Sequence, residues 1–469
     1  MSTSPSRLEF LQAKLAETRQ QRVRQPTGCL VSDSAEFPPL DDTELLTARP
    51  RLLPRWVNRR LLVPLTAVAA LCLFGYLAVG WWNLPTQADV KHGELLFTHN
   101  WEPNDPLSNG GDGLGPVFNA RSCVECHFQG GTGGGGGLKH NVAAIEVLPT
   151  EGHPYPLADV VHAFAIEPGF KESMRTAREA FPIIPKGMTI TAVCRQPLKK
   201  DYDPLRPHSI NTPTLFGSGA IDRISDVAIK SNHFGRTVAG MQREFHADFT
   251  ATHSGRVRVL PDGRIGKFGW KAQFATLEEF VANACAVEIG LTTPTHKQRA
   301  PKQHREDESA KPDMSERQFN QLVAFVSHLP MPKGSLPEDP TERERAVRGR
   351  KLFATVGCAD CHTPDLGGAT GVYSDFCLHD LTDHQSNGYI ETPDVPVPPE
   401  YPQQSEWKTP PLWGVAQTAP YLHDGSAATL TAAIEAHAGQ ARNVREKFRS
   451  LAKADKDALL QFLETLTVE

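Results

Sequence analysis

Two short stretches decide the fold of this chain: Cys123-Val124-Glu125-Cys126-His127 and Cys358-Ala359-Asp360-Cys361-His362. Each matches the pattern C-x-x-C-H, in which two thiols three positions apart can add to the two vinyl groups of one porphyrin. The adjacent histidine is then held under the iron as its proximal ligand. The sequence therefore predicts two covalently attached c-type haems, with His127 and His362 as proximal ligands.

Other sites also use paired cysteines. In a zinc ribbon the two pairs lie about 15–20 residues apart, whereas Cys126 and Cys358 are 232 positions apart. A thioredoxin-type site needs a βαβ unit, which the sequence near either motif does not suggest. The glycine-rich run 130–137 lacks the preceding strand and the following Lys-Ser/Thr of a phosphate-binding loop. It is more typical of a flexible loop near a haem edge.

Length and composition limit the remaining function classes. A chain of 469 residues has room for two or three domains. Its formal net charge of −5 gives no reason to expect a nucleic acid as partner. The 37 glycines and 38 prolines predict a loop-rich globular protein rather than a polytopic membrane protein.

One segment is apolar enough to anchor the chain in a membrane. Residues 61–82 are almost entirely apolar, and a helix of that length crosses a bilayer. Four arginines between positions 51 and 60 precede it, and Trp81 and Trp82 end it. The positive-inside rule then predicts a single-pass inner-membrane protein, with a polar cytoplasmic tail over 1–60 and periplasmic haem domains. A cleaved signal peptide fits poorly, because so long a tail precedes the apolar run.

The exported part contains an internal repeat. The stretch TPTLFG at 212–217 returns as TPPLWG at 409–414, and Ala-Thr-Leu at 275–277 returns at 428–430. We expect a helix after each second landmark, over 277–290 and 430–437. The first copy is longer by about 44 residues, which we place within 218–267. The repeat predicts two duplicated haem domains, over 86–335 and 336–469.

Several motifs in the same order resemble one family. They are Gly111 to Asn119 (GDGLGPVFN), Phe268 to Ala272 (FGWKA), and Trp413-Gly414 followed by Tyr421 to Gly425 (YLHDG). Over residues 90–469 the sequence resembles the di-haem oxidoreductase family. That family is similar to bacterial di-haem cytochrome c peroxidases, which reduce hydrogen peroxide with electrons from a small periplasmic cytochrome or copper protein. The resemblance implies a mainly α protein, in which each domain has a cytochrome c fold, all-α around its haem.

The resemblance also implies roles for single residues. His437 stands where the peroxidases have the axial methionine of the second haem, and Trp270 matches the tryptophan between the haems. Glu288 resembles the distal acid, whereas the distal glutamine is replaced by Phe280. Each has a plainer alternative: a surface histidine, a core tryptophan and an exposed helical glutamate.

A calcium site is implied in the same way. The peroxidases bind calcium between their domains through an asparagine of an Asn-x-Pro-Thr stretch and through backbone carbonyls of a Thr-x-Pro-Tyr stretch. Asn211, Thr418 and Pro420 occupy those positions here, and neutral oxygens suit a hard cation. Alternatively, both stretches are only turns.

Three functions stay open at this point. The first is peroxide reduction, in which the haem of His437 receives electrons and Glu288 moves a proton at the haem of His127. The second is a six-coordinate electron-transfer cytochrome, and the third is an oxidase of a protein or small molecule through a high-valent haem pair. Phe280 favours the last two, and a homodimer is allowed by all three.

The two motifs give the first prediction. Denatured protein should retain a c-type pyridine haemochrome at two haems per chain, because thioether bonds survive unfolding. A yield of one haem or none would contradict the assignment.

Overall fold

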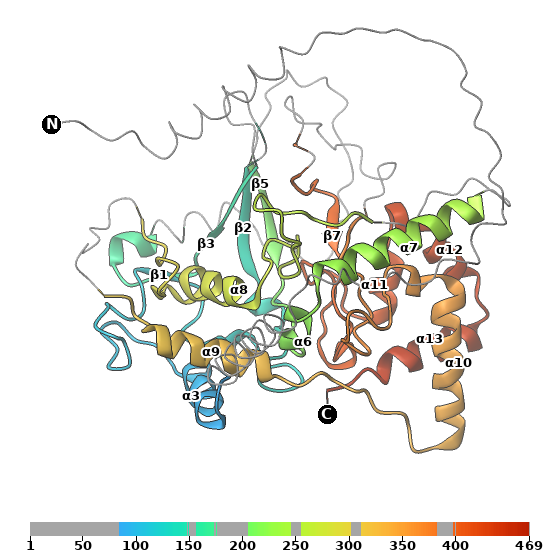
Figure 1. The fold of residues 1–469 in the computed structure, drawn as a ribbon, viewed down its shortest axis with the longest axis horizontal. Helices are drawn as coiled ribbons and strands as arrows, with labels where there is room; N and C mark the ends of the chain where they lie inside the picture. The colour runs from blue at the N-terminus through green and yellow to red at the C-terminus, as the bar shows by residue number, and fades with distance from the viewer. Residues whose placement is uncertain are drawn as a thin grey trace, which may run out of the picture. The chain divides into compact units, whose positions relative to one another are not determined.

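The computed structural model describes residues 84–147, 149, 156–172, 175, 205–244, 255–301, 311–381, 397, 398 and 400–468 (Figure 1). The predicted tail over 1–60 and the predicted anchor over 61–82 lie outside these residues. Among the helices that the structure describes, none is both long and apolar enough to cross a membrane.

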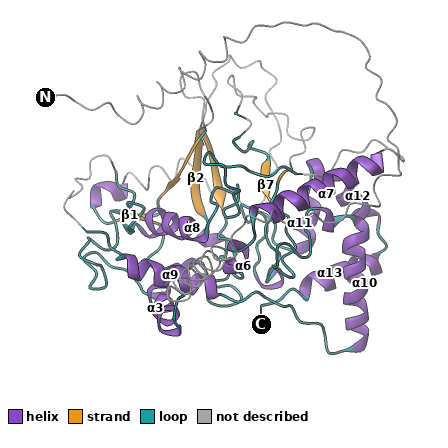
Figure 2. Cartoon of the chain, viewed as in Figure 1, coloured by secondary structure: helices purple, strands orange, loops and turns teal. Residues whose placement is uncertain are grey.

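Helices form most of the regular structure (Figure 2). Before position 330 they are α3 (Gln87–Thr98), α4 (Cys123–Cys126), η1 (Leu138–His140), α6 (Ser218–Asp222), α7 (Asp226–Glu244), α8 (Leu277–Ala284), the π-helical turn η2 (Cys285–Ile289) and α9 (Glu316–His328). After it they are α10 (Pro340–Val356), η3 (Cys358–Asp360), η4 (Val415–Gln417), α11 (Leu430–Ala436), η5 (Gly439–Ala441), α12 (Arg442–Ser450) and α13 (Lys453–Glu464).

Local sequence sets several of these helix starts. Thr86, Thr276 and Ser315 each form a capping box with the residue three positions later, which satisfies backbone N–H groups that the first turn leaves free. The helix predicted over 277–290 is present, but its last turn is a π-helix that ends at Gly290, whose φ of 73° is left-handed. A π turn re-aims the side chains that follow it.

The structure also contains antiparallel strands, so the expectation of domains that are all-α is wrong. A three-stranded sheet has β2 (Val142–Val147) between β3 (Leu157–Val161) and β5 (Leu205–Ile210). Shorter pairs join β1 (Val117–Phe118) to β4 (Phe164–Ala165), and β6 (Leu378–Asp380) to β7 (Glu406–Lys408). β5 and β7 lead directly into the two copies of the repeated Thr-Pro stretch, so both copies begin at the end of a paired strand.

Two close helix pairs are built alike. α3 packs on α9, where a Cβ on Gly93 would overlap the carbonyl oxygen of Gln321. α10 packs on α13, where a Cβ on Gly349 would overlap the carbonyl oxygen of Ala458. A glycine thus lets each pair of backbones approach closely.

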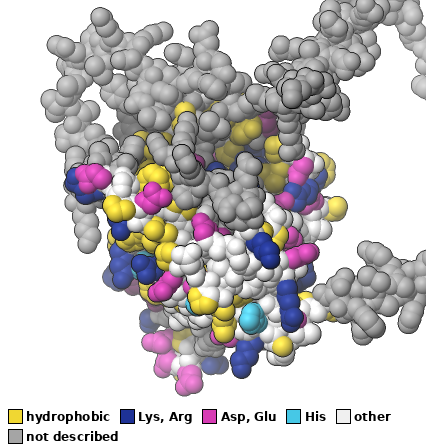
Figure 3. All heavy atoms as spheres, turned by 90° about the vertical axis from the view of Figure 1, so that its left-hand side faces the viewer, with side chains coloured by type: hydrophobic (Ala, Val, Ile, Leu, Met, Phe, Trp, Pro, Cys, Tyr) yellow, Lys and Arg dark blue, Asp and Glu magenta, His cyan; other side chains and the backbone are white. Residues whose placement is uncertain are grey.

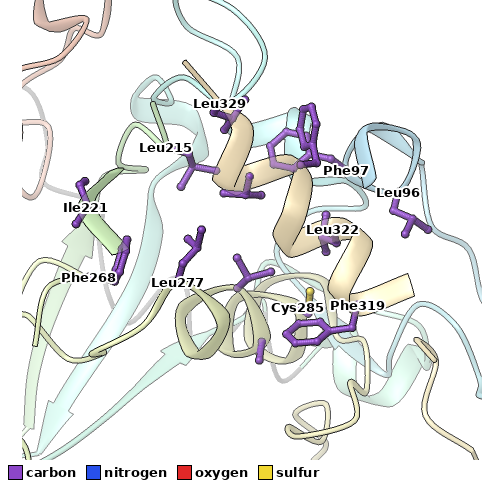
Figure 4. Close-up of a cluster of buried hydrophobic side chains, with 14 of the residues drawn as sticks. Leu96, Phe97, Leu215, Ile221, Phe268, Leu277, Cys285, Phe319, Leu322 and Leu329 are labelled. Atoms are coloured by element: carbon purple, nitrogen blue, oxygen red, sulfur yellow. The ribbon is translucent and has the colours of Figure 1, made fainter. Parts of the chain in front are cut away.

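The hydrophobic residues form two clusters. The larger one joins α3, α6, α8 and α9, and Figure 4 shows Phe97, Leu277, Phe319 and Leu322 among its side chains. The smaller one joins α10, α12 and α13 through Phe353, Phe448 and Phe462, with other apolar side chains. Full burial of one such side chain contributes about 1.5–3 kcal/mol, so each cluster can hold its own helices together. On the face shown in Figure 3, acidic and basic side chains are interspersed with apolar ones.

Candidate haem centre

The second C-x-x-C-H motif follows directly on α10. Gly357, with a left-handed φ of 110°, ends that helix, and Cys358 begins the short turn η3. The Nδ1 of His362 donates a hydrogen bond to the carbonyl oxygen of Tyr373 at 3.0 Å, so Nε2 is left as the metal-binding atom. Burial lowers the pKa of His362 to about 4, which keeps the ring in the neutral form that binds a metal.

His437 lies opposite that ring. It caps the C-terminus of α11, and its Nδ1 donates to the carbonyl oxygen of Ala433 at 2.7 Å. The ring centroids of His362 and His437 are 6.4 Å apart. A metal–imidazole nitrogen bond of about 2 Å on each side leaves room for one metal ion between the two rings. The two histidines therefore fit the axial positions of one haem.

A cavity of about 740 Å³ surrounds this pair. Its wall is mostly apolar, as a porphyrin requires, and it includes Phe353, Leu412, Leu430 and Phe448 from the second half. Leu215, Phe268, Trp270 and Phe280 from the first half line it too. Residues from both halves of the chain therefore line the cavity, and its volume and mostly apolar wall fit a haem.

The first motif is built differently. Cys123 to Cys126 form the short helix α4, and the Nδ1 of His127 donates to the carbonyl oxygen of Gly134 at 3.1 Å. Burial lowers the pKa of His127 to about 4. Cys123 and Cys126 pack against the larger hydrophobic cluster, whereas Cys358 packs against the smaller one. A zinc ribbon would need all four thiols at one metal ion, so this separation disfavours it.

The glycine-rich run after the first motif forms a partly buried turn. Gly130, Gly131 and Gly133 have left-handed φ values, and the residues from 133 to 136 are buried. The chain turns back so that Gly134 can accept the bond from His127, while the N–H of Gly136 donates to the carbonyl oxygen of Thr212. The run therefore positions the ring of His127.

Glu288 lies on the π-helical turn η2 and is only partly exposed. Its Oε2 accepts a hydrogen bond from the side-chain amide of Asn119 at 2.7 Å, and its backbone oxygen accepts one from the Asn119 N–H. Burial raises the pKa of Glu288 to about 7. Asn119 is the last residue of the motif GDGLGPVFN, but no sequence signal joined it to a glutamate 169 positions away.

Trp270 and Phe280 both line the cavity. The indole N–H of Trp270 donates to the carbonyl oxygen of Asn211 at 2.9 Å. Phe280 stacks on Phe268, with ring centroids 5.7 Å apart. The position at which the resemblance implies a polar glutamine is therefore part of an apolar stack.

The three predicted calcium ligands also line the cavity: Asn211, Thr418 and Pro420. The side-chain amide of Asn211 donates to the carbonyl oxygen of Gly136 and to the Oδ1 of Asn141, at 2.9 and 2.8 Å. Its nitrogen is therefore used within the protein. Among the described residues, a different group has side chains close enough to share a metal ion: Cys361, Asp375 and His379.

Asp375 and His379 belong to a buried network of hydrogen bonds and ion pairs. The Oδ2 of Asp375 bonds both His379 Nε2, at 2.9 Å, and Arg236 Nη1, at 2.7 Å. Burial opposes ionisation of Asp375, but His379 and Arg236 lower its pKa to about 2. His379 Nδ1 lies 3.6 Å from the Sγ of Cys361. Since Arg236 belongs to α7 in the extra segment of the first half, this segment reaches the second motif. Arg236, Asp375 and His379 belong to no sequence motif, so this link depends on the tertiary fold.

Comparison with known proteins agrees with the resemblance. Residues 261–466 match the family described as "Di-haem oxidoreductase, putative peroxidase". Cytochrome c551 peroxidase of Nitrosomonas europaea is 26% identical over 225 residues, which are 45% of this chain and 60% of that protein. The match thus spans three fifths of this relative.

Two solved structures are also similar to parts of the chain. Hydrazine synthase of Kuenenia stuttgartiensis has a TM-score of 0.30 at 16% identity, over 55% of this chain and 73% of that one. A MauG-like protein associated with microbial copper homeostasis has a TM-score of 0.29 at 19% identity, over 45% and 74%.

The facing imidazoles give the second prediction. His437→Ala should remove one axial ligand of the second haem, so its low-spin spectrum should change. His328→Ala is the matched control, because His328 makes the same Nδ1 bond to the carbonyl four residues earlier but is exposed. Optical and electron paramagnetic resonance spectra of the oxidised variants are the measurement. An unchanged spectrum for His437→Ala would show that His437 is not the ligand.

Proposed function

We propose, from the match of residues 261–466 to the di-haem oxidoreductase family, that this chain reduces hydrogen peroxide with electrons from a small redox donor. The observation that carries this proposal is the Glu288 carboxyl group, held by Asn119 in a partly buried position. Its pKa of about 7 lies close to the pH at which it would work.

A carboxyl group with that pKa suits a proton shuttle. Reduction of peroxide needs two electrons and two protons, and it yields two molecules of water. Haem iron, when bound, supplies the site at which peroxide is reduced. Glu288 would take a proton from one peroxide oxygen and give it to the oxygen that leaves as water, since transfer in both directions costs least when the pKa is near the working pH. Asn119 would keep the carboxyl group oriented.

Covalent attachment belongs to the same proposal. The four motif cysteines would hold two c-type haems, with His127 and His362 as proximal ligands and His437 as the sixth ligand of the second. A second nitrogen in place of thioether sulfur donates more strongly to ferric iron, which lowers the potential. We therefore infer that the second haem works at a lower potential than a histidine–methionine haem, with Trp270 in the wall between the halves as the route for electrons.

Features shared by the two halves of the chain support a common origin for them. Each has a C-x-x-C-H motif after a helix with a close-packed glycine, and each has a Thr-Pro stretch after a paired strand. We infer an internal duplication, with the halves at 86–335 and 336–469. Residues 61–82 would anchor the chain in the inner membrane. The donor would be a small periplasmic cytochrome or copper protein.

A second candidate is an electron-transfer cytochrome. Phe280 supports it, because its stack on Phe268 puts an apolar ring where the resemblance implies a polar side chain that orients peroxide. In this case neither haem turns over peroxide, and Glu288 is only a buried acid.

Glu288 gives the third prediction. Glu288→Gln should lower peroxide turnover by about 10²- to 10⁴-fold, the usual contribution of a proton-transferring side chain, while both haems stay attached. Glu278→Gln is the matched control, since Glu278 is exposed on the preceding helix α8. The measurement is steady-state peroxide consumption with a reduced small donor. Equal turnover in both variants, or none in the wild type, would favour the electron-transfer cytochrome.

Calcium gives the fourth prediction. We propose that Asn211 and the backbone oxygens of Thr418 and Pro420 bind one calcium ion between the halves, and that the ion raises thermal stability by mass action. Equilibrium dialysis should find calcium bound to the wild type and lost in Asn211→Ala. Asn141→Ala perturbs the same amide network without removing a proposed ligand, so it should keep the ion. Dialysis that finds no calcium in the wild type removes the site.

A further inference from the structure

Lys408 is a buried cation that pairs directly with no carboxylate among the described residues. It ends β7 and is 6% exposed. Its Nζ donates one long hydrogen bond, 3.4 Å, to the carbonyl oxygen of Thr409, and it lies 5.4 Å from the centroid of the Phe376 ring. Among the residues that the structure describes, no carboxylate forms an ion pair with it.

The nearby acid is already occupied. Asp375 is the carboxylate whose charge acts on Lys408, but its Oδ2 bonds Arg236 and His379, and its Oδ1 accepts from the N–H of Cys377. Both carboxylate oxygens of Asp375 therefore accept hydrogen bonds from groups other than Lys408. An isolated ammonium in a protein interior is strongly unfavourable unless an anion or several hydrogen bonds compensate its charge.

The cavity offers a place for that anion. Lys408 is one of its lining residues, together with His362 and His437. Burial lowers the pKa of Lys408 to about 8, so the side chain stays mainly protonated at neutral pH. An anion bound in this cavity would both neutralise the ammonium and accept its hydrogen bonds.

A second buried lysine of the same cavity provides the contrast. Lys267 is 7% exposed and also lines the wall. Its Nζ donates to the carbonyl oxygens of Asp222 and Ile224, at 2.7 and 3.1 Å. The ammonium of Lys267 is thus satisfied by the protein, whereas that of Lys408 needs a further partner.

We propose that Lys408 binds a propionate carboxylate of the haem that lies between His362 and His437. The propionates are the two anionic groups of an otherwise apolar macrocycle, so they match the chemistry that this ammonium lacks. The inference rests on the haem assigned to this cavity under the proposed function, but not on peroxide reduction. It makes Lys408 a cofactor-binding residue that also sets the local charge at the second haem.

The charge has a measurable consequence. A cation beside the propionate disfavours the ferric state, which carries one more positive charge than the ferrous state, and so raises the reduction potential. Loss of that cation should make the potential of this haem more negative. A lysine that only packs in the core would change stability and leave the potential where it was.

The experiment uses the holoprotein of the wild type and of three variants: Lys408→Met, Lys408→Arg and Lys267→Met. Haem content is measured first by pyridine haemochrome, and the potential of the low-spin haem is then measured by spectroelectrochemical titration. We expect a more negative potential in Lys408→Met, a near wild-type value in Lys408→Arg, and a smaller shift in Lys267→Met, because the Lys267 ammonium is bonded to backbone carbonyls. A Lys408→Met protein with the wild-type potential at equal haem content overturns the proposal.

Two further outcomes are distinguishable. If Lys408→Met yields no holoprotein, resonance Raman spectra of the wild type and Lys408→Arg decide, because a guanidinium should shift the propionate bending bands and identical bands overturn the proposal. A wild type without a second haem overturns it together with the haem assignment, and the haem count reveals this. A wild type that holds both haems but does not turn over peroxide would contradict the proposed function, and the proposal for Lys408 would still hold.

Discussion

The imidazole rings of His362 and His437 lie close together, with their centroids 6.4 Å apart. Backbone turns and hydrogen bonds of the second half hold the two rings in place. α10 ends at Gly357 so that the chain can turn into the motif, and α11 ends at His437 itself. Each Nδ1 is bonded to a backbone carbonyl, which fixes the ring and directs Nε2 to the space between. A metal ion at this place would therefore meet preoriented ligands.

The cavity around the two rings brings together side chains from both halves of the chain. Its wall includes residues from before and after position 336, and Arg236 of α7 contacts Asp375 beside the second motif. Buried charges are tolerated there only because most are paired. Asp375 accepts hydrogen bonds from Arg236 and His379, whereas Lys408 has no carboxylate partner within the described part of the chain. A bound haem would complete both the packing and the charge balance of this region.

Local patterns predicted much of this site, and tertiary contacts account for what they missed. The C-x-x-C-H motifs and the capped helix that begins at Leu277 are encoded by neighbouring residues, whereas His437 was predicted from the family resemblance. The sheet of β2, β3 and β5 brings together segments up to 68 positions apart (Val142 and Ile210). The pairing of Asn119 with Glu288 and that of Arg236 with Asp375 also depend on long-range folding, so no motif reveals them. The sequence does not single out Lys408 either, because a missing ion-pair partner is visible only in the folded chain.

Iron anomalous diffraction from crystals of the holoprotein would locate the haem irons. We expect two iron peaks per chain, one of them between the Nε2 atoms of His362 and His437, at bonding distance from both. A peak that lies beside His362 with His437 turned away, or a cavity that holds no iron, would contradict this expectation.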